Sequence, residues 1–163
     1  MAEDYYVDQY HALNYLTFNV GFCYFATEIS QIEQIIILGE VRKLPSVPQF
    51  IEGVFESYNR IVIVIDLRKI FQLESTAMED IKVIICSIND SLIGFIVDDV
   101  SQVIQKTRSE IQPSPPPVIR GINPNCVYGM LDEDDKHVLL INLEKILTKQ
   151  ESQILSKVDS VTL

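Results

Sequence analysis

The chain has 163 residues, 47% of them hydrophobic, with 13 basic and 23 acidic residues and a net charge of −10. This size allows one sizeable core or two small cores that share a face, and the negative charge disfavours binding to nucleic acid or anionic lipid. No run approaches the roughly 20 apolar residues that span a bilayer, and the acidic start is unlike a secretion signal. We therefore expect a cytoplasmic protein with no direct membrane insertion.

The first half of the chain, from about Asn14 to Phe71, contains a series of short strand patterns. The alternating stretch "NYLTFNV" precedes the turn candidate "GF", and "YFATEISQIEQI" follows from Tyr24 to Ile35. The prolines of "LPSVPQF", Leu44 to Phe50, predict a rigid, extended connector. The run "GVFESYNRIVIVIDLRKIF", Gly53 to Phe71, predicts a strand, a tight turn, a buried strand and the start of a helix that Asp66 caps.

The second half, from about Ile81 to Leu147, repeats this order after a polar joint, "QLESTAMED". "KVIICSI" and the turn candidate "NDS" precede "FIVDDVSQVIQK", Phe95 to Lys106, which matches "YFATEISQIEQI" in residue type. The prolines of "QPSPPPV", Gln112 to Val118, favour a second connector, with a proline-rich ligand for a partner as the alternative. "GMLDEDDKHVLLINLEKIL", Gly129 to Leu147, predicts the same strand, turn, strand and helix, with Asn142 as the cap.

The repeat predicts a duplicated, mainly β scaffold. Each copy has about five short strands, which is close to the number that can curl into a small closed barrel without exposed edges. We expect one barrel from about 14 to 71 and a second from about 81 to 147, packed tightly because neither alone buries much surface. The end of the chain predicts a helix at about 143–158, whose apolar stripe packs on the barrels or, alternatively, binds a partner. The stripe consists of Leu143, Ile146, Leu147, Ile154, Leu155 and Val158.

No pattern in the sequence predicts a cofactor or a metal ion. His11 and His137 are the only histidines and lie in unrelated segments, so they do not form a metal-binding pair. The acidic run at 132–135 lacks the glycine and the glutamate that a calcium loop requires, and it favours a solvated hairpin turn. The glycines are scattered singly, so there is no phosphate-binding loop. We therefore predict no cofactor, no metal site and no nucleotide binding.

A duplicated scaffold without a catalytic motif favours a protein that binds other proteins and has no catalytic residues. The alternative is an enzyme whose pocket is assembled from scattered carboxylates such as Asp66, Asp98 and Asp99. Asp66 already has a predicted role as a helix cap, which weakens this alternative. A pocket containing a carboxylate with a perturbed pKa would favour the enzyme.

Seven motifs, in this order and at this spacing, resemble the CheW family of chemotaxis adaptors from about Asn14 to Leu155. They are "YLTF", "IEQI" (Ile32 to Ile35), "VPQFIEGV" (Val47 to Val54), "VIVIDLRKIF" (Val62 to Phe71), "IGFIVDDVSQVI" (Ile93 to Ile104), "IQPSPP" (Ile111 to Pro116) and "LLINLEKIL" (Leu139 to Leu147). The resemblance implies a single domain of two five-stranded, Src-homology-3-like barrels around a shared core, plus a C-terminal helix. It also implies a non-enzymatic adaptor that couples chemoreceptors, at membrane-associated arrays, to the histidine kinase CheA. Another interaction module of a chemosensory pathway is the alternative.

The resemblance also assigns binding residues. For the groove that receives the receptor tip they are Ile32, Ile35, Tyr58, Arg60 and Gly94. Tyr58 stands where the family has an arginine, and Gln34 where it has a glutamate, so both departures remove charge; Arg60 could substitute for the missing cation. For the kinase, the resemblance assigns the strand edge at Gly53 and Val54.

Overall fold

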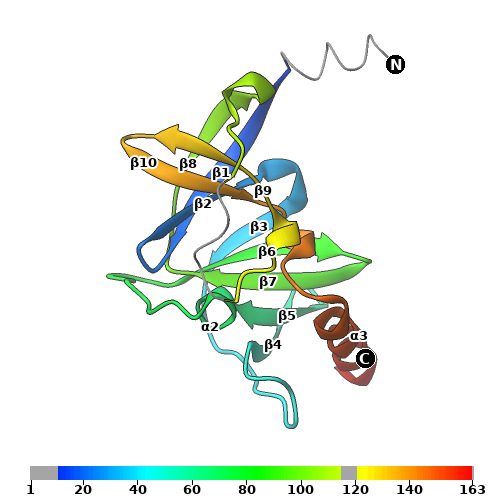
Figure 1. Ribbon diagram of the computed structural model, residues 1–163. Coiled ribbons are helices and arrows are strands. Elements are labelled where there is room, and N and C mark those ends of the chain that lie inside the picture. Colours follow the sequence, from blue (N-terminus) through cyan, green and yellow to red (C-terminus); the bar gives the residue numbers. More distant parts are fainter. Residues whose placement is uncertain (1–10, 115–120, 163) are drawn as a thin grey trace.

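The computed structural model describes residues 11–114 and 121–162 and contains two five-stranded sheets (Figure 1). The first, barrel 1, has the strand order β8-β1-β2-β10-β9. Its strands are β1 (Ala12–Val20), β2 (Cys23–Glu28), β8 (Asp99–Thr107), β9 (Val127–Glu133) and β10 (Lys136–Ile141). The second, barrel 2, has the order β3-β6-β7-β5-β4. Its strands are β3 (Ile32–Ile37), β4 (Ile51–Ser57), β5 (Arg60–Asp66), β6 (Lys82–Ile88) and β7 (Ser91–Val97). The predicted mainly β fold with two five-stranded barrels is confirmed.

Short helical segments connect the strands. They are η1 (Ile29–Gln31), α2 (Leu67–Phe71), η2 (Arg108–Glu110), η3 (Pro124–Cys126) and η4 (Leu143–Lys145). None of the helices in the described ranges is both long and apolar enough to cross a bilayer. The second predicted connector, at 112–118, and the "IQPSPP" motif lie partly outside the described residues.

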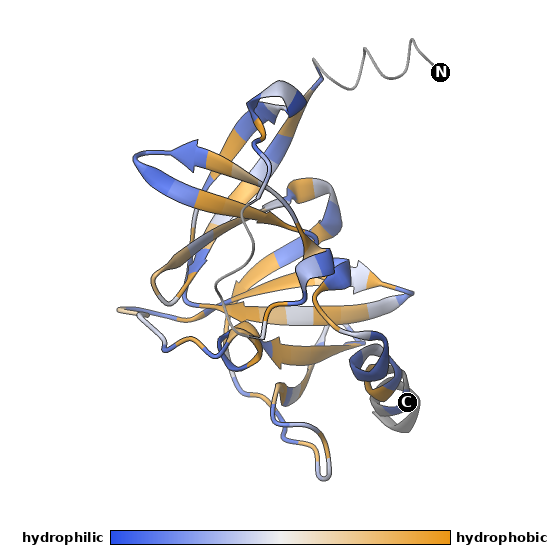
Figure 2. Ribbon diagram, in the orientation of Figure 1, coloured by the Kyte–Doolittle hydropathy of each residue, from blue (hydrophilic) through white to orange (hydrophobic). Residues whose placement is uncertain are grey.

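Each barrel has its own interior, and a third core lies between the barrels. Strand β5 shows how this works, because its side chains are buried on both faces, as "IVIVI" predicted. Val62 and Val64 lie in a cluster built only from barrel 2, whereas Ile63 and Ile65 belong to the core shared with barrel 1. In that shared core the ring of Phe25 lies with its centroid 5.7 Å from Phe18 and 5.3 Å from Phe71. Figure 2 shows the apolar strands facing one another, with polar residues at the β9–β10 turn and in the last helix.

Three hairpins turn through pairs of residues with positive φ. The pairs are Tyr58–Asn59 at 49° and 63°, Asn89–Asp90 at 51° and 66°, and Asp134–Asp135 at 50° and 61°. Two consecutive positive φ angles give a type I′ turn, whose twist matches that of the flanking strands, and Asn and Asp tolerate it well. The polar runs that predicted turns are therefore turns, including the acidic run at 132–135.

The two repeated units lie in different barrels, as predicted. In barrel 2, β4, β5 and α2 follow one another, and β5 runs parallel to β7. In barrel 1, β9, β10 and η4 do the same, and β10 runs parallel to β2. Both helix caps are present: Asp66 accepts the backbone N–H of Arg68 and Asn142 accepts that of Glu144, each at 3.0 Å.

The barrels do not coincide with the two halves of the sequence, so the predicted boundaries of 14–71 and 81–147 are wrong. Barrel 2 is built from the contiguous residues 32–97, and barrel 1 from β1 and β2 together with β8, β9 and β10. Each barrel thus takes two strands from one copy and three from the other. The joint at 72–80 lies within barrel 2, and the chain crosses between barrels at η1 and at Asp98. Alternating patterns show which residues form strands, but they do not show which strands pair.

The C-terminal helix starts later than predicted. Leu143 begins a short 3₁₀ turn, and α3 spans Lys149–Thr162. The backbone N–H of Thr148 donates to Glu151 at 2.9 Å, and the N–H of Glu151 donates back to the Thr148 hydroxyl at 3.2 Å. This reciprocal capping box fixes the first turn. Two residues of the predicted stripe, Ile154 and Leu155, pack half-buried against the shared core; the side chain of Val158 is outside the described part.

Candidate partner-binding surfaces

Strand β3 lies at one edge of barrel 2 and presents apolar side chains to solvent. Ile35, predicted from the resemblance, is exposed, and so is Ile37 two residues further along the same strand. Ile32 is half-buried and packs against the shared core, so it supports the edge rather than forming its surface. Sequence reasoning missed Ile37, although the alternation of "IEQIII" places it on the same face as Ile35.

An ion pair links the start of β5, just after the β4–β5 turn, to the β3 edge. Tyr58 projects from the turn and is one of the most exposed large side chains in the described residues. Arg60, just after the turn, forms an ion pair with Glu33 of β3, with Nη1 3.5 Å from Oε2. We call the surface formed by Glu33, Ile35, Tyr58 and Arg60 the β3–turn surface; Ile37 lies further along β3, where it pairs with Lys82 of β6. Arg60 is therefore present where the resemblance expects a cation, but it already has an anionic partner.

Gly94 does not belong to the β3–turn surface. It is buried in β7, the central strand of barrel 2, with β6 and β5 on either side. A Cβ at this position would lie 2.7 Å from Cγ1 of Val83 and 3.2 Å from Cγ1 of Val62. Gly94 therefore leaves room for packing inside the barrel, and its expected place in an open groove is wrong.

The two residues assigned to the kinase are also buried. Val54 belongs to the shared core, and its backbone N–H and C=O bond to Arg42 at 2.9 Å and 2.8 Å. Gly53 has a φ of 150°, and a Cβ there would lie 2.7 Å from Cγ1 of Val41 and closer still to the carbonyl oxygen of Arg42. The 41–42 segment closes barrel 2 against β4, so the protein itself fills the space that the prediction gave to a partner. Gly53 and Val54 therefore present no exposed side chain to a partner, and their assignment to the kinase stays a prediction from the resemblance.

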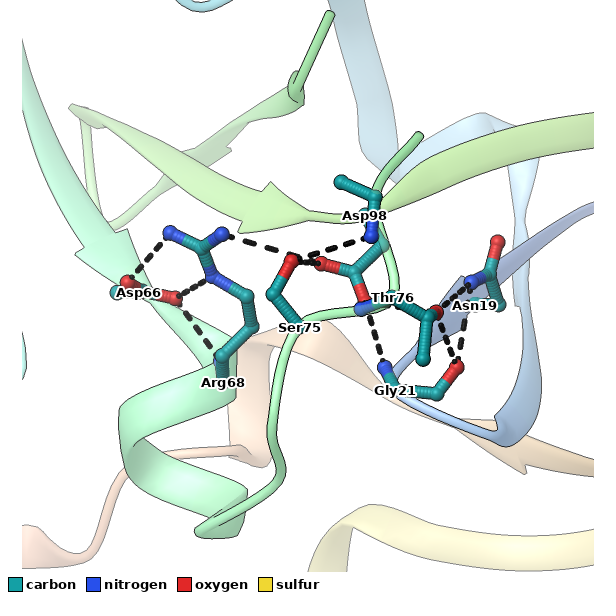
Figure 3. A network of polar contacts seen from close by, with 8 residues as sticks. Asn19, Gly21, Asp66, Arg68, Ser75, Thr76 and Asp98 are labelled. Carbon is teal, nitrogen blue, oxygen red and sulfur yellow. Dashed lines mark hydrogen bonds and ion pairs between the residues drawn. The ribbon is translucent and has the colours of Figure 1, made fainter. Parts of the chain in front are cut away.

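The scattered carboxylates of the enzyme alternative form a structural network instead (Figure 3). Arg68 donates to Asp66 through Nε and Nη2, both at 2.9 Å, and its Nη1 lies 3.9 Å from Asp98. Asp98 accepts the N–H of Gly21 at 2.7 Å, the N–H of Thr76 at 2.8 Å and the hydroxyl of Ser75 at 2.7 Å. Asp99 lies outside this network: it is exposed and accepts the backbone N–H of Val100.

The environment of Asp98 explains its charge state. Burial raises the pKa of this carboxyl, but the hydrogen bonds from Thr76, Ser75 and Gly21 outweigh burial and hold the pKa below its usual range. With a 1% exposed side chain surrounded by donors of its own chain, Asp98 is an ionised anchor for three segments. The perturbed carboxylate therefore has a structural cause, and it has no access to a substrate.

The described residues contain no cluster of three or more His, Cys, Asp or Glu side chains that could hold a metal ion. The two histidines are not brought together: His137 Nδ1 lies 2.6 Å from Asp132 on the exposed β9–β10 hairpin, and His11 lines a pocket of about 630 Å³ at the opposite end of β9, with Tyr15 and Tyr128.

The chain is similar to chemotaxis scaffold proteins in both sequence and structure. It is 27% identical to chemotaxis protein CheW of Treponema pallidum over 146 residues, which are 86% of this chain and 85% of that protein. It is 26% identical to chemotaxis protein CheW of Klebsiella aerogenes over 145 residues, 88% of this chain and 87% of that protein. The crystal structure of scaffolding protein TtCheW from Thermoanaerobacter tengcongensis has a TM-score of 0.76 and 27% identity, covering 86% of this chain and 91% of that one. A model of the CheW-like domain matches residues 14–151, and the chain belongs to the CheW family.

Proposed function

We propose that this chain is an adaptor that couples the cytoplasmic tip of chemoreceptors to a CheA-type histidine kinase and catalyses no reaction itself. The match of the CheW-like domain to residues 14–151 supports this most directly. The relatives named chemotaxis proteins and the solved scaffolding protein agree with it. Such an adaptor reaches membrane-associated receptor arrays through its partners.

The contacts of the Asp66 and Asp98 carboxylates support the absence of catalysis. Asp66 accepts hydrogen bonds from Nε and Nη2 of Arg68. Asp98 accepts the backbone N–H groups of Gly21 and Thr76. A general acid or base must reach the substrate proton within hydrogen-bond distance. These two carboxylates are anchors of the fold and do not meet that requirement.

The β3–turn surface is the proposed receptor site. It offers Ile35 and Tyr58 for apolar contact, and its cation Arg60 is already paired with Glu33. The central parts of protein interfaces are depleted in charge and enriched in aromatic residues. A helical receptor tip laid against this edge would therefore bind by apolar contact, and its affinity would depend little on salt.

The test is a co-sedimentation assay with receptor-containing membranes, full-length kinase and this chain. The kinase should sediment with the membranes only when the chain is present. Ile35→Glu should lower receptor binding by about tenfold or more, because a buried unpaired charge costs several kcal/mol and about 1.4 kcal/mol is tenfold. Val103→Glu, at an exposed position of barrel 1, is the matched control and should leave binding unchanged.

Two results would contradict the proposal. If the kinase binds neither this chain nor the chain–receptor complex, the chain is not a coupling adaptor of that kinase. If a calorimetric titration shows micromolar affinity for ATP, or the chain hydrolyses ATP, the non-enzymatic part is wrong.

A further inference from the structure

Barrel 1 has an open mouth at the end where β1 begins. A pocket of about 630 Å³ lies there, lined by residues of β1, β2, η2 and the start of β9. Its most buried lining residue is Tyr15, which is 1% exposed and belongs to the interior cluster of barrel 1. Binding sites for small molecules have volumes of roughly 300–1,000 Å³ and occur in the mouths of β-barrels. The residues of the β3–turn surface do not line this pocket.

Two tyrosines meet inside the pocket. The hydroxyls of Tyr15 and Tyr128 hydrogen-bond to each other, although the two residues come from β1 and β9. Burial raises the pKa of both hydroxyls, and the negative charge of Glu28 raises both further. Both phenols therefore stay neutral at pH 7. The side chain of Tyr128 is 47% exposed, so part of its ring remains accessible to a ligand.

One carboxylate and one guanidinium line the pocket from opposite sides of β1. Glu28 of β2 pairs directly with Tyr15, and the Cβ atoms of such a pair lie about 4.5–5.5 Å apart. Arg108 follows β8, which lies on the other side of β1. Both charges act on the hydroxyl of Tyr15, whose pKa Glu28 raises and Arg108 lowers. β2 and β8 are roughly 10 Å apart across β1, and the two side chains reach over it into one pocket.

This combination of groups fits a small zwitterion. A guanidinium can bind a carboxylate through two parallel N–H groups. A carboxylate beside the face of a tyrosine ring attracts an ammonium group. Leu13 and Ile111 add apolar surface to the same pocket. A free amino acid with an apolar side chain carries all three features, whereas the end of a peptide chain carries only one of the two charges.

We propose that the mouth of barrel 1 binds a free amino acid with an apolar side chain. Arg108 holds the carboxylate, and Glu28 and the ring of Tyr128 hold the ammonium group. The side chain of the ligand lies against Leu13 and Ile111. This site is separate from the partner-binding surface and does not depend on the proposed adaptor function. Through it the chain binds a small metabolite directly.

The test titrates the purified chain with L-phenylalanine in a calorimeter. Binding should be saturable, with a dissociation constant of about 1 mM or below. Two analogues each lack one charge: 3-phenylpropionate has no amino group, and phenethylamine has no carboxylate. Each should bind about tenfold more weakly or worse. The inference is overturned if L-phenylalanine does not approach saturation by about 10 mM, or if either analogue binds as tightly as the amino acid.

Two variants separate the two charges. Arg108→Gln should bind L-phenylalanine about tenfold more weakly, and no better than phenethylamine, because the partner of the carboxylate is gone. Glu28→Gln should bind it no better than 3-phenylpropionate, because the partner of the ammonium group is gone. Arg42→Gln, at an exposed arginine of barrel 2, is the matched control and should bind like wild type. Unfolding midpoints in urea verify that all variants are folded. Wild-type affinity in both pocket variants would overturn the inference.

Discussion

The chain crosses between its two barrels twice, and the crossings use different chemistry. The first, at η1, is neutral: the Thr27 hydroxyl donates to Gln31 at 3.3 Å, and Gln31 donates to the helix cap Asn142 at 3.3 Å. The second centres on the ionised Asp98, which accepts hydrogen bonds as short as 2.7 Å. Thr27, at the end of β2 just before η1, and Asp98 are both buried. Hydrogen bonds to a charged group are roughly twice as strong as neutral ones, so the duplicated scaffold has one weak and one strong crossing.

The two crossings differ in chemistry because they hold different numbers of segments in place. At η1 the chain needs only to connect β2 to β3 beside the cap Asn142. At Asp98 the carboxylate also fixes the β1–β2 turn through Gly21 and the loop after α2 through Thr76. Thr27 and Asp98 occupy equivalent positions in the two copies of the repeat. The carboxylate of Asp98 accepts hydrogen bonds from two loops, whereas the Thr27 hydroxyl donates to Gln31 alone.

Replacing the charged centre should have the largest effect. Asp98→Ala leaves the buried N–H groups of Gly21 and Thr76 without an acceptor and the nearby Arg68 with one carboxylate fewer. The free energy of unfolding should fall by about 3–5 kcal/mol, the range for breaking a buried charged pair. Urea denaturation at pH 7 measures it. Asp99→Ala, at the exposed neighbouring residue, is the control and should stay within about 0.5 kcal/mol of wild type; equal effects of the two changes would contradict a charged anchor.

Acid should remove part of the same contribution. The pKa of Asp98 in the folded protein lies below its ordinary value of 3.8. Its stabilising effect is therefore complete above about pH 4 and is lost as the pH falls through the folded pKa. The difference in unfolding free energy between wild type and Asp98→Asn should be constant from pH 7 to pH 5 and shrink below pH 4. Stability curves of the two proteins against pH test this, and a difference that grows on acidification would contradict it.

The neutral crossing should respond least. Thr27→Val keeps the shape of the buried side chain and removes one hydroxyl with a 3.3 Å bond to Gln31. The free energy of unfolding should fall by about 1 kcal/mol or less, with the same pH dependence as wild type. A loss as large as that of Asp98→Ala would show that the two crossings hold the barrels equally well.

The sequence was a good guide to local structure. Asp66 and Asn142 predicted both helix caps, and the polar runs predicted the type I′ turns, because these features depend on residues close in the chain. The family and the double-barrel fold also followed from motifs in order. The exchange of strands between barrels did not, since β5 pairs with β7 and β10 with β2 across long intervals that alternation does not specify.

The binding residues were harder to predict. Ile35, Tyr58 and Arg60 lie where a partner can reach them. Gly53 and Gly94 do not, because a glycine that permits close contact with a partner and one that permits close contact within the fold look alike in a sequence. Burial separates the two cases, and it depends on tertiary neighbours such as Arg42 and Val83.

The discontinuous make-up of barrel 1 has a consequence for the order of folding during synthesis. Barrel 2 is complete once residue 97 has emerged, and all its strand pairs form over one contiguous stretch. β1 must wait for β8, and β2 for β10, which is the last strand to be made. Closing such long loops is slow, and unpaired strand edges invite aggregation. We therefore expect barrel 2 to form first on the nascent chain. Until β8 and β10 have been made, the free edges of β1 and β2 remain open to binding by chaperones and to pairing with other copies of the chain.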